Sequence, residues 1–240
     1  MSRRLSPDSR ATARVLERQM NNWELARLQR LERPSQRAEV EDFITISRQV
    51  GIPAERVAEA LGKHFGWPVF GRSLLEAMAG DDEARRRIYH SMDERDLRWW
   101  EEALRGLLEN GFDVNDYFHR LTHTVLSLVR QSPCILVGRG CDFLLPRHLG
   151  LRLRLVAPLE PRISTIAEEF GLNRQSAISK IERIEAERSE YLHHHFGERV
   201  DDPARSDLVI NLGRWDADGV IELVLAALAK RPLRPAAAAP

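Results

Sequence analysis

Short apolar runs alternate along this chain with longer stretches of helical periodicity, and this alternation limits the folds open to it. Partly β-branched apolar runs at 43–47, 134–138, 151–157 and 208–212 predict buried strands, and 67–70 predicts a weaker fifth. The intervening segments predict helices over 53–65, 73–79, 93–109, 115–130, 161–170, 175–195 and 217–229. Such alternation favours an α/β fold, a mostly parallel sheet with helices on both faces. Ligands of these sheets bind beyond the carboxyl ends of the strands, so the residues that follow each strand are candidates for chemistry.

The two ends of the chain fall outside this alternation. Residues 1–40 place apolar side chains at roughly helical spacing among many Arg and Glu, which predicts an amphipathic helical arm that ends before Pro34. The apolar stripe of this arm needs a partner, either the body of the chain or a second subunit. Residues 231–240 are mostly Ala and Pro, which predicts a disordered tail. The folded body is therefore expected over 41–230.

Composition and charge exclude several classes of protein. The 240 residues contain 36 basic and 36 acidic side chains, so no overall charge attracts nucleic acid or an acidic membrane surface. No apolar run approaches the roughly 18 to 20 residues of a membrane-spanning helix, and residues 1–9 are too polar for a secretory signal. Cys134 and Cys141 are too few for a disulfide framework, and Cys134 opens an apolar run where a buried thiol is expected. We therefore expect a cytoplasmic globular protein without membrane or nucleic-acid partners.

The loop after the first expected strand has the local architecture of a phosphate-binding loop. A strand, a turn at Gly51 and a helix follow one another, which places backbone amides and a helix N-terminus where a phosphate can bind. However, the loop lacks the lysine of a Walker motif, and Pro53 removes one amide donor. A phosphate site and a purely structural turn both fit these residues.

Several arginines are candidates for binding an anion. Arg139 follows the third expected strand between two glycines, where it can reach either an anion or a carboxylate of a neighbouring helix. Arg183 and Arg188 lie on the expected helix over 175–195, where surface ion pairs such as Arg183 with Glu187 are the alternative. Arg162, at the start of the preceding helix, is interpreted as a surface residue.

Two other kinds of site receive little support. His119 and His123 lie one helical turn apart but have no third ligand nearby in the sequence, so no metal site is predicted. Ile166, Ala167, Gly171, Leu172 and the helix beginning near Arg174 resemble a helix-turn-helix. However, residues 160–191 contain five basic and seven acidic side chains, which disfavours contact with DNA phosphates.

Taken in order, the motifs resemble the cytidylate kinase-like family, P-loop relatives of the nucleoside monophosphate kinases. The matching stretches are ITISRQ at 44–49 with Gly51, GWPVF at 66–70 with Arg72, LVGRG at 136–140, LRLRLVAPLE at 151–160, and DP at 202–203 with DLVIN at 207–211. They cover about residues 43–230, so the N-terminal arm lies outside the resemblance.

The resemblance implies a three-layer P-loop-kinase-like fold, with a parallel sheet of about five strands and a lid over about 172–200. It also implies transfer of a phosphoryl group from ATP, with Mg²⁺, to CMP, dCMP or a related acceptor. Carried over by position, Arg72 and Arg139 bind the acceptor, and Arg183 and Arg188 act as catalytic residues from the lid. The positions that would hold the ATP phosphates are Ser47, Arg48, Gly51, Ala54, Glu55 and Arg56.

The chain also departs from the family pattern. After the first glycine of the loop the family usually has Ser, Gly, Gly, Arg and Glu, whereas this chain continues IPAER over 52–56. Gly71 and Glu185 stand where the family typically has Asp. These departures predict an eroded ATP loop and weak or lost catalysis. The alternative is a noncatalytic pseudokinase scaffold or nucleotide sensor that dimerises through its N-terminal arm.

Overall fold

The strands form one parallel sheet, as the sequence predicts. The computed structural model describes residues 17, 18, 20, 21, 25, 42–80, 116–147, 149–196 and 202–230. The strands are β1 (Phe43–Arg48), β2 (Val69–Phe70), β3 (Cys134–Val137), β4 (Leu151–Val156) and β5 (Leu208–Asn211). Their order is β2-β3-β1-β4-β5, and every pair is parallel. The central strand, β1, places Phe43 opposite Cys134 of β3 and Ile44 opposite Leu151 of β4.

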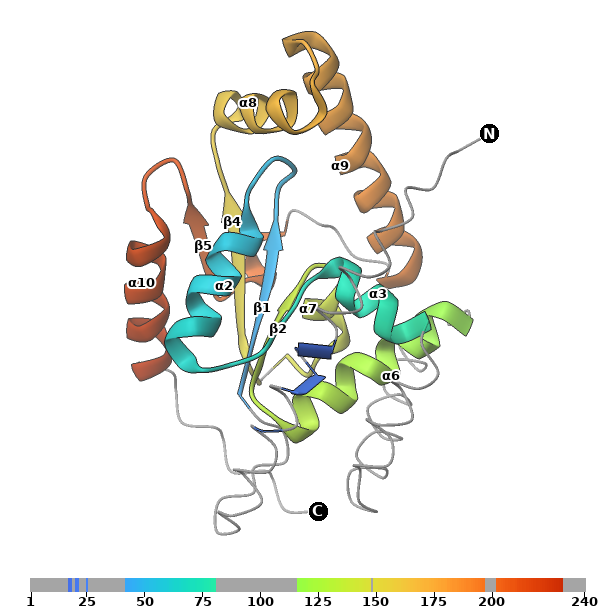
Figure 1. Cartoon of the computed structure of the whole chain (residues 1–240), viewed down its shortest axis with the longest axis vertical. Coiled ribbons are helices and arrows are strands. Elements are labelled where there is room, and N and C mark those ends of the chain that lie inside the picture. Colours follow the sequence, from blue (N-terminus) through green and yellow to red (C-terminus); the bar gives the residue numbers. More distant parts are fainter. Residues whose placement is uncertain are drawn as a thin grey trace.

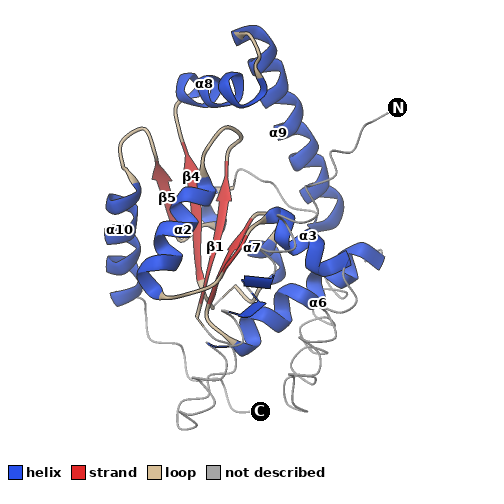
Figure 2. Ribbon diagram, viewed as in Figure 1, coloured by secondary structure: helices blue, strands red, loops and turns tan. Residues whose placement is uncertain are grey.

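Helices cover both faces of the sheet, which gives the predicted three layers. They are α2 (Ala54–Phe65), α3 (Arg72–Gly80), α6 (Asp116–Gln131), α7 (Cys141–Leu144), α8 (Leu159–Phe170), α9 (Arg174–Phe196), the 3-10 turn η2 (Pro203–Arg205) and α10 (Ala217–Ala229). Figure 1 shows α2 and α10 on one face and α3, α6 and α7 on the other. The strand arrows point toward α8 and α9, which stand beyond the carboxyl ends of the sheet (Figure 2). The predicted helix over 93–109 lies outside the described residues.

Strand β4 shows how the sequence assigns side chains to the two faces. Leu151, Leu153 and Leu155 alternate with Arg152 and Arg154, and successive side chains of a strand point to opposite faces. The three leucines join the core formed with α2 and α10. The two arginines therefore lie on the face covered by α3, α6 and α7.

Arg152 is a buried cation whose hydrogen bonds are met by backbone carbonyls. Its side chain is 2% exposed, and burial is the main cause that lowers its pKa, to about 10. The guanidinium donates to five carbonyl oxygens, those of Asp142, Leu145, Pro146, Arg147 and Leu149, at 2.8–3.2 Å. The backbone amide of Arg152 donates to Asp207 at 2.7 Å. Arg152 thus joins α7 and the turn that follows it to the sheet.

The core on the α3 and α6 face also contains both cysteines and one residue of the N-terminal segment. Cys134 and Cys141 are buried free thiols, as predicted for Cys134, and burial raises the pKa of both. Met20 is 1% exposed within the same cluster, whereas Leu25 is 58% exposed. The sequence predicts that the apolar stripe of the arm packs on the body of the chain or on a second subunit. For Met20, the partner is the body of its own chain. Most of the predicted arm over 1–40 and the tail over 231–240 lie outside the described residues.

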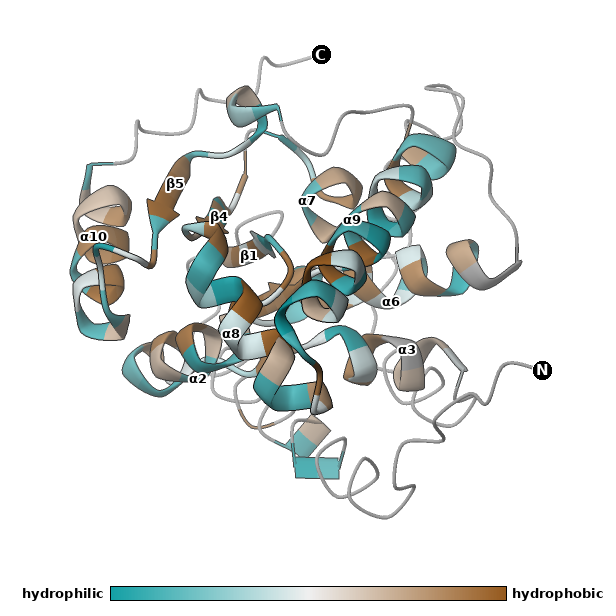
Figure 3. Ribbon diagram, turned by 90° about the horizontal axis from the view of Figure 1, so that it is seen from above, coloured by the Kyte–Doolittle hydropathy of each residue, from teal (hydrophilic) through white to brown (hydrophobic). Residues whose placement is uncertain are grey.

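Helices α8 and α9 form a hairpin above the sheet with a small core of its own. Ile163, Ile166, Ala177 and Ile181 pack together in it, and Val50 from the loop after β1 joins them. The far end of α9 reaches the main core through Phe196. Seen from above, the hairpin crosses over the apolar sheet and carries many hydrophilic residues (Figure 3). Among the described residues, no helix has the length and apolar character needed to cross a bilayer.

Candidate functional site

A cavity of about 240 Å³ lies beneath α9 at the carboxyl ends of the central strands. Its walls come from β1, β4, α3, α7, α9 and the turn after β3. The lining residues are Ser47, Arg48, Arg72, Gly138, Arg139, Gly140, Asp142, Phe143, Arg154, Ile184, Glu187, Arg188, Tyr191 and Leu192. The site therefore lies where ligands bind in open parallel sheets.

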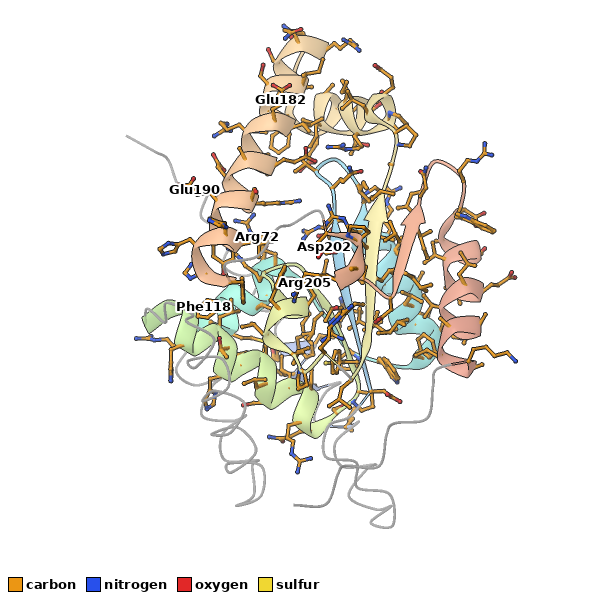
Figure 4. The ribbon with its side chains drawn as sticks, turned by 180° about the vertical axis from the view of Figure 1, so that it is seen from behind. Arg72, Phe118, Glu182, Glu190, Asp202 and Arg205 are labelled. Atoms are coloured by element: carbon orange, nitrogen blue, oxygen red, sulfur yellow. The ribbon has the colours of Figure 1, made fainter. Side chains whose placement is uncertain are left out.

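Five arginines from five elements line this cavity. Arg48 ends β1, Arg72 begins α3, Arg139 follows β3, Arg154 lies in β4 and Arg188 lies in α9. In Figure 4, Arg72 lies beside the lower turns of α9 on the side toward the sheet, whereas Glu190 lies on the opposite side of this helix. Guanidinium groups bind phosphate and carboxylate through paired hydrogen bonds, so this arrangement suits an anionic ligand.

Negative charge in the lining does not balance these arginines. Only Asp142 and Glu187 contribute carboxylates, so the positive charges exceed the negative ones by three. Glu187 also accepts a hydrogen bond from Arg183, at 3.3 Å, and Arg48 pairs with Glu55 outside the lining. The lining itself therefore carries an excess of positive charge.

Three of the cavity arginines are buried close to other cations, which lowers their pKa values. Burial is the largest cause that lowers the pKa of Arg48, of Arg139 and of Arg188, in the last case to about 10. Repulsion from Arg72 lowers all three further. A bound anion would relieve this repulsion, so the arrangement favours an anion at their common centre.

Arg139 reaches the cavity from an unusual turn. Gly138, Arg139 and Gly140 have φ values of 77°, 55° and 69°, and Arg139 is the only non-glycine residue with positive φ among those the structure describes. Side chains other than glycine's rarely adopt such backbone angles, and strain of this kind is concentrated at functional sites. The Arg139 guanidinium carbon lies 5.7 Å from the centroid of the Tyr191 ring, so α9 contacts this arginine directly.

The loop after β1 is packed against the α8–α9 hairpin. The Val50 amide donates to Glu185 at 3.3 Å, and the Val50 carbonyl accepts from Arg162 Nε at 2.8 Å. Arg162 also forms an ion pair with Glu185. A Cβ atom at Gly51, whose φ is 82°, would lie 2.6 Å from the Arg162 carbonyl oxygen.

The structure brings half of the sequence-predicted site residues into the cavity. Those that line it are Ser47, Arg48, Arg72, Arg139 and Arg188. Gly51 lies in the loop after β1, and Ala54, Glu55 and Arg56 form the first turn of α2, outside the cavity lining. The Glu55 carboxylate accepts from Arg48 at 3.3 Å. Arg183 also lies outside the lining and pairs with Glu187 on the exposed side of α9, which is the alternative that the sequence left open.

Sequence reasoning missed three residues of this region. The sequence predicts Arg162 at the surface, but its exposed fraction is 6% because Val50 and Glu185 pack against it. Both partners lie far from Arg162 in the sequence, so local sequence patterns do not reveal these contacts. Tyr191 gave no signal that separates it from other residues of a polar helix. Arg154 did carry a signal, since the LRLRLV pattern of β4 places two cations on one face of a strand that has neighbours on both sides in the sheet.

Comparison with known proteins identifies the family. A model of the cytidylate kinase-like family matches residues 43–214. The chain belongs to the cytidylate kinase-like family. The cytidylate kinase of Thermococcus kodakarensis is 29% identical over 104 residues, which are 43% of this chain and 53% of that protein. The cytidylate kinase of Halobacterium salinarum is 22% identical over 187 residues, 78% of this chain and 88% of that one.

The sequence matches to the first curated relatives cover only part of those proteins. The chain spans about half the length of the first curated relatives that it matches. Among solved structures, an uncharacterised protein from Eubacterium ventriosum matches with a TM-score of 0.60 and 15% identity, over 80% of this chain and 100% of that one. This likeness shows that the two chains share the same three-layer α/β fold.

The loop after β1 does not fit the phosphates of ATP as it is arranged here. The Val50 amide is bonded to Glu185, and the Ala54 amide donates to the Ile52 carbonyl at 2.8 Å. Pro53 has no amide hydrogen, and the Arg162 backbone occupies the space beside Gly51. Within the described parts of the chain, no group of three or more His, Cys, Asp or Glu side chains is placed to hold a metal ion. In this cytidylate kinase-like chain, the arginine cavity, rather than the loop after β1, has the charge and the open space that suit an anionic ligand.

Proposed function

We propose that this protein binds CMP or dCMP in the arginine cavity, and that it transfers a phosphoryl group from ATP to this acceptor slowly. The observation that carries the proposal is the convergence of Arg48, Arg72, Arg139 and Arg188 on one cavity at the carboxyl edge of the sheet. Membership of the cytidylate kinase-like family supports the choice of a cytidine nucleotide. The packed loop after β1 supports slow transfer.

The cavity offers separate surfaces to the two ends of a nucleotide. Arg72, Arg139 and Arg188 supply guanidinium donors for the phosphate. Phe143 and Leu192 belong to the apolar part of the wall, which suits the base. Because α9 covers the cavity, it would also keep water away from the bound phosphate.

Charge neutralisation is the chemistry that the chain itself can supply. Phosphoryl transfer depends on positioning and electrostatic stabilisation, so it needs no covalent nucleophile from the protein. The cavity arginines would bind the acceptor phosphate and reduce its repulsion toward an incoming phosphoryl group. The loop after β1 does not fit a triphosphate in this arrangement, so the contribution of the described residues lies at the acceptor.

A noncatalytic nucleotide sensor is the second candidate. The packing of Val50 and Gly51 against Arg162 and Glu185 favours the sensor. With the loop after β1 packed in this way, the acceptor cavity is present but no open loop is available for the donor phosphates. Dimerisation through the N-terminal arm stays a prediction, although Met20 occupies the core of its own chain. For DNA binding, the contacts offer no support, because α9 packs over the cavity.

Replacing Arg139 with Ala is expected to weaken CMP binding about 100-fold, since a hydrogen bond to a charged group contributes roughly 1.5–3 kcal/mol. Calorimetric titration of the purified protein with CMP and dCMP measures this effect. Arg183→Ala is the matched control, because Arg183 is an exposed arginine of the same helix as Arg188 but lies outside the cavity lining. The affinity of this variant for CMP should stay within about twofold of wild type. Equal losses in both variants, or no CMP binding by the wild type, would contradict the proposal.

Turnover separates the two candidate functions. With saturating ATP, Mg²⁺ and CMP, formation of ADP and CDP is expected to be slower than the roughly 1–100 s⁻¹ usual for kinases. CMP binding without any CDP formation would favour the sensor, whereas turnover within the usual range would show that the loop after β1 opens readily.

A further inference from the structure

Arg162 and Glu185 join three parts of the chain that are far apart in sequence. Arg162 belongs to α8, Glu185 belongs to α9, and both contact the main chain of Val50 after β1. The Arg162 side chain is 7% exposed and that of Glu185 is 40% exposed. An ion pair that also satisfies a backbone amide and a backbone carbonyl fixes the positions of all three segments.

Apolar packing adds to this attachment. Val50 is 3% exposed and belongs to the hairpin core with Ile163, Ile166 and Ile181. Position 51 favours glycine for two reasons: its φ is positive, and a Cβ there would lie only 2.6 Å from the Arg162 carbonyl oxygen. The loop and the α8–α9 hairpin therefore form one packed unit.

The same attachment sets the position of the helix that covers the cavity. Arg188 lies less than one helical turn beyond Glu185 and donates to the Arg48 carbonyl at 3.2 Å. Arg188 and Tyr191 both line the cavity, whereas Glu185 and Arg162 do not. Glu185 can thus influence a ligand only through the placement of α9.

We infer that Arg162 and Glu185 are positioning residues that hold α9 over the cavity, so that the nucleotide site is complete without a donor nucleotide. The inference rests on the proposed function for the identity of the ligand, CMP. If a lid closes only when both substrates are bound, the affinity for the acceptor depends on whether the donor is present. Here the chain's own ion pair takes the place of the donor in holding the lid.

Hydrogen exchange tests the attachment without any ligand. In Glu185→Gln the Val50 amide keeps a hydrogen-bond acceptor, but a neutral one, and the ion pair between Arg162 and residue 185 is lost. Hydrogen exchange at the Val50 amide should therefore become at least about tenfold faster. Glu182→Gln is the matched control, because Glu182 is an exposed residue of the same helix outside the cavity (Figure 4), and exchange at Val50 should not change. Unchanged exchange at Val50 in Glu185→Gln would overturn the inference.

Calorimetry with CMP, in the presence and absence of ATP and Mg²⁺, tests the consequence for the site. For the wild type, the CMP affinity should agree within about twofold under the two conditions, since the lid is already held. Glu185→Gln should bind CMP about tenfold more weakly, with Glu182→Gln unchanged and Glu185→Asp recovering most of the loss.

A wild type that binds CMP only with ATP, or a Glu185→Gln variant with wild-type affinity, would overturn the inference. If the wild type bound no CMP at all, the proposed function would be wrong, and the exchange result alone would decide the attachment.

Discussion

Replacing Arg152 with Met is expected to lower the free energy of unfolding by about 4 kcal/mol. Met fills part of the same volume but donates no hydrogen bond, so the five carbonyl oxygens lose the guanidinium as their donor. The bonds to Leu145 and Leu149 are fully buried, whereas the Pro146 oxygen keeps a second donor, the Leu149 amide at 3.1 Å. Each buried acceptor left without a partner costs roughly 1–3 kcal/mol, although relaxation and water recover part of the sum. The loss should therefore exceed that of an ordinary surface substitution several times over.

Urea unfolding of Arg152→Met and of two comparison variants measures this prediction. Arg152→Lys keeps the charge but has three donors on one nitrogen, so we expect a loss of about 2 kcal/mol. Arg214→Met changes an exposed arginine and should stay within about 0.5 kcal/mol of wild type. A loss below about 1 kcal/mol in Arg152→Met would show that the carbonyls around it find water instead.

Gly51→Ala is expected to lower the free energy of unfolding by about 3 kcal/mol, through backbone strain and steric overlap together. The φ of Gly51 is 82°, and the new methyl group would meet the Arg162 carbonyl oxygen at 2.6 Å. That oxygen belongs to the backbone of α8, so it cannot move away as a flexible side chain would. The hairpin must shift, which should also weaken CMP binding.

Gly66→Ala separates the two contributions to this loss. Gly66 ends α2 with a φ of 69°, but no atom lies within 4 Å of the position that a Cβ would take. Its replacement should cost about 1 kcal/mol, which measures the strain of a positive φ alone. Thermal and urea unfolding of both variants give the difference, and equal losses would contradict the close packing of the loop against α8.

The fold was predictable because its signals are local. Each strand is a short apolar run between helical segments, and the predicted bounds of all five differ from those in the structure by at most two residues at either end. The β2 segment differs by two residues because Trp67, an apolar residue just before the strand, resembles part of it in the sequence, whereas the strand begins only at Val69. Hydrophobic periodicity reports burial along one element, so it places elements well.

The site was less predictable because its contacts are between elements. Arg162 and Arg183 both lie on charged helices, yet Arg162 is buried against Val50 and Arg183 faces solvent beside Glu187. Nothing near either residue in the sequence distinguishes them, because the partner of Arg162 comes from a loop 112 residues earlier. Position along the chain indicated Arg139 and Arg188, family resemblance added Arg72, and the three-dimensional packing added Arg154 and Tyr191.

The central position of β1 has a consequence for the synthesis of the protein on the ribosome. Phe43 and Ile44 leave the ribosome before their partners Cys134 and Leu151, which follow roughly 90 and 107 residues later. At about 5–20 residues per second, this apolar strand waits roughly 5 to 20 s with both of its edges unpaired. Such a segment is prone to aggregate or to bind chaperones during this interval. The yield of folded protein should therefore depend on how quickly the ribosome delivers β3 and β4.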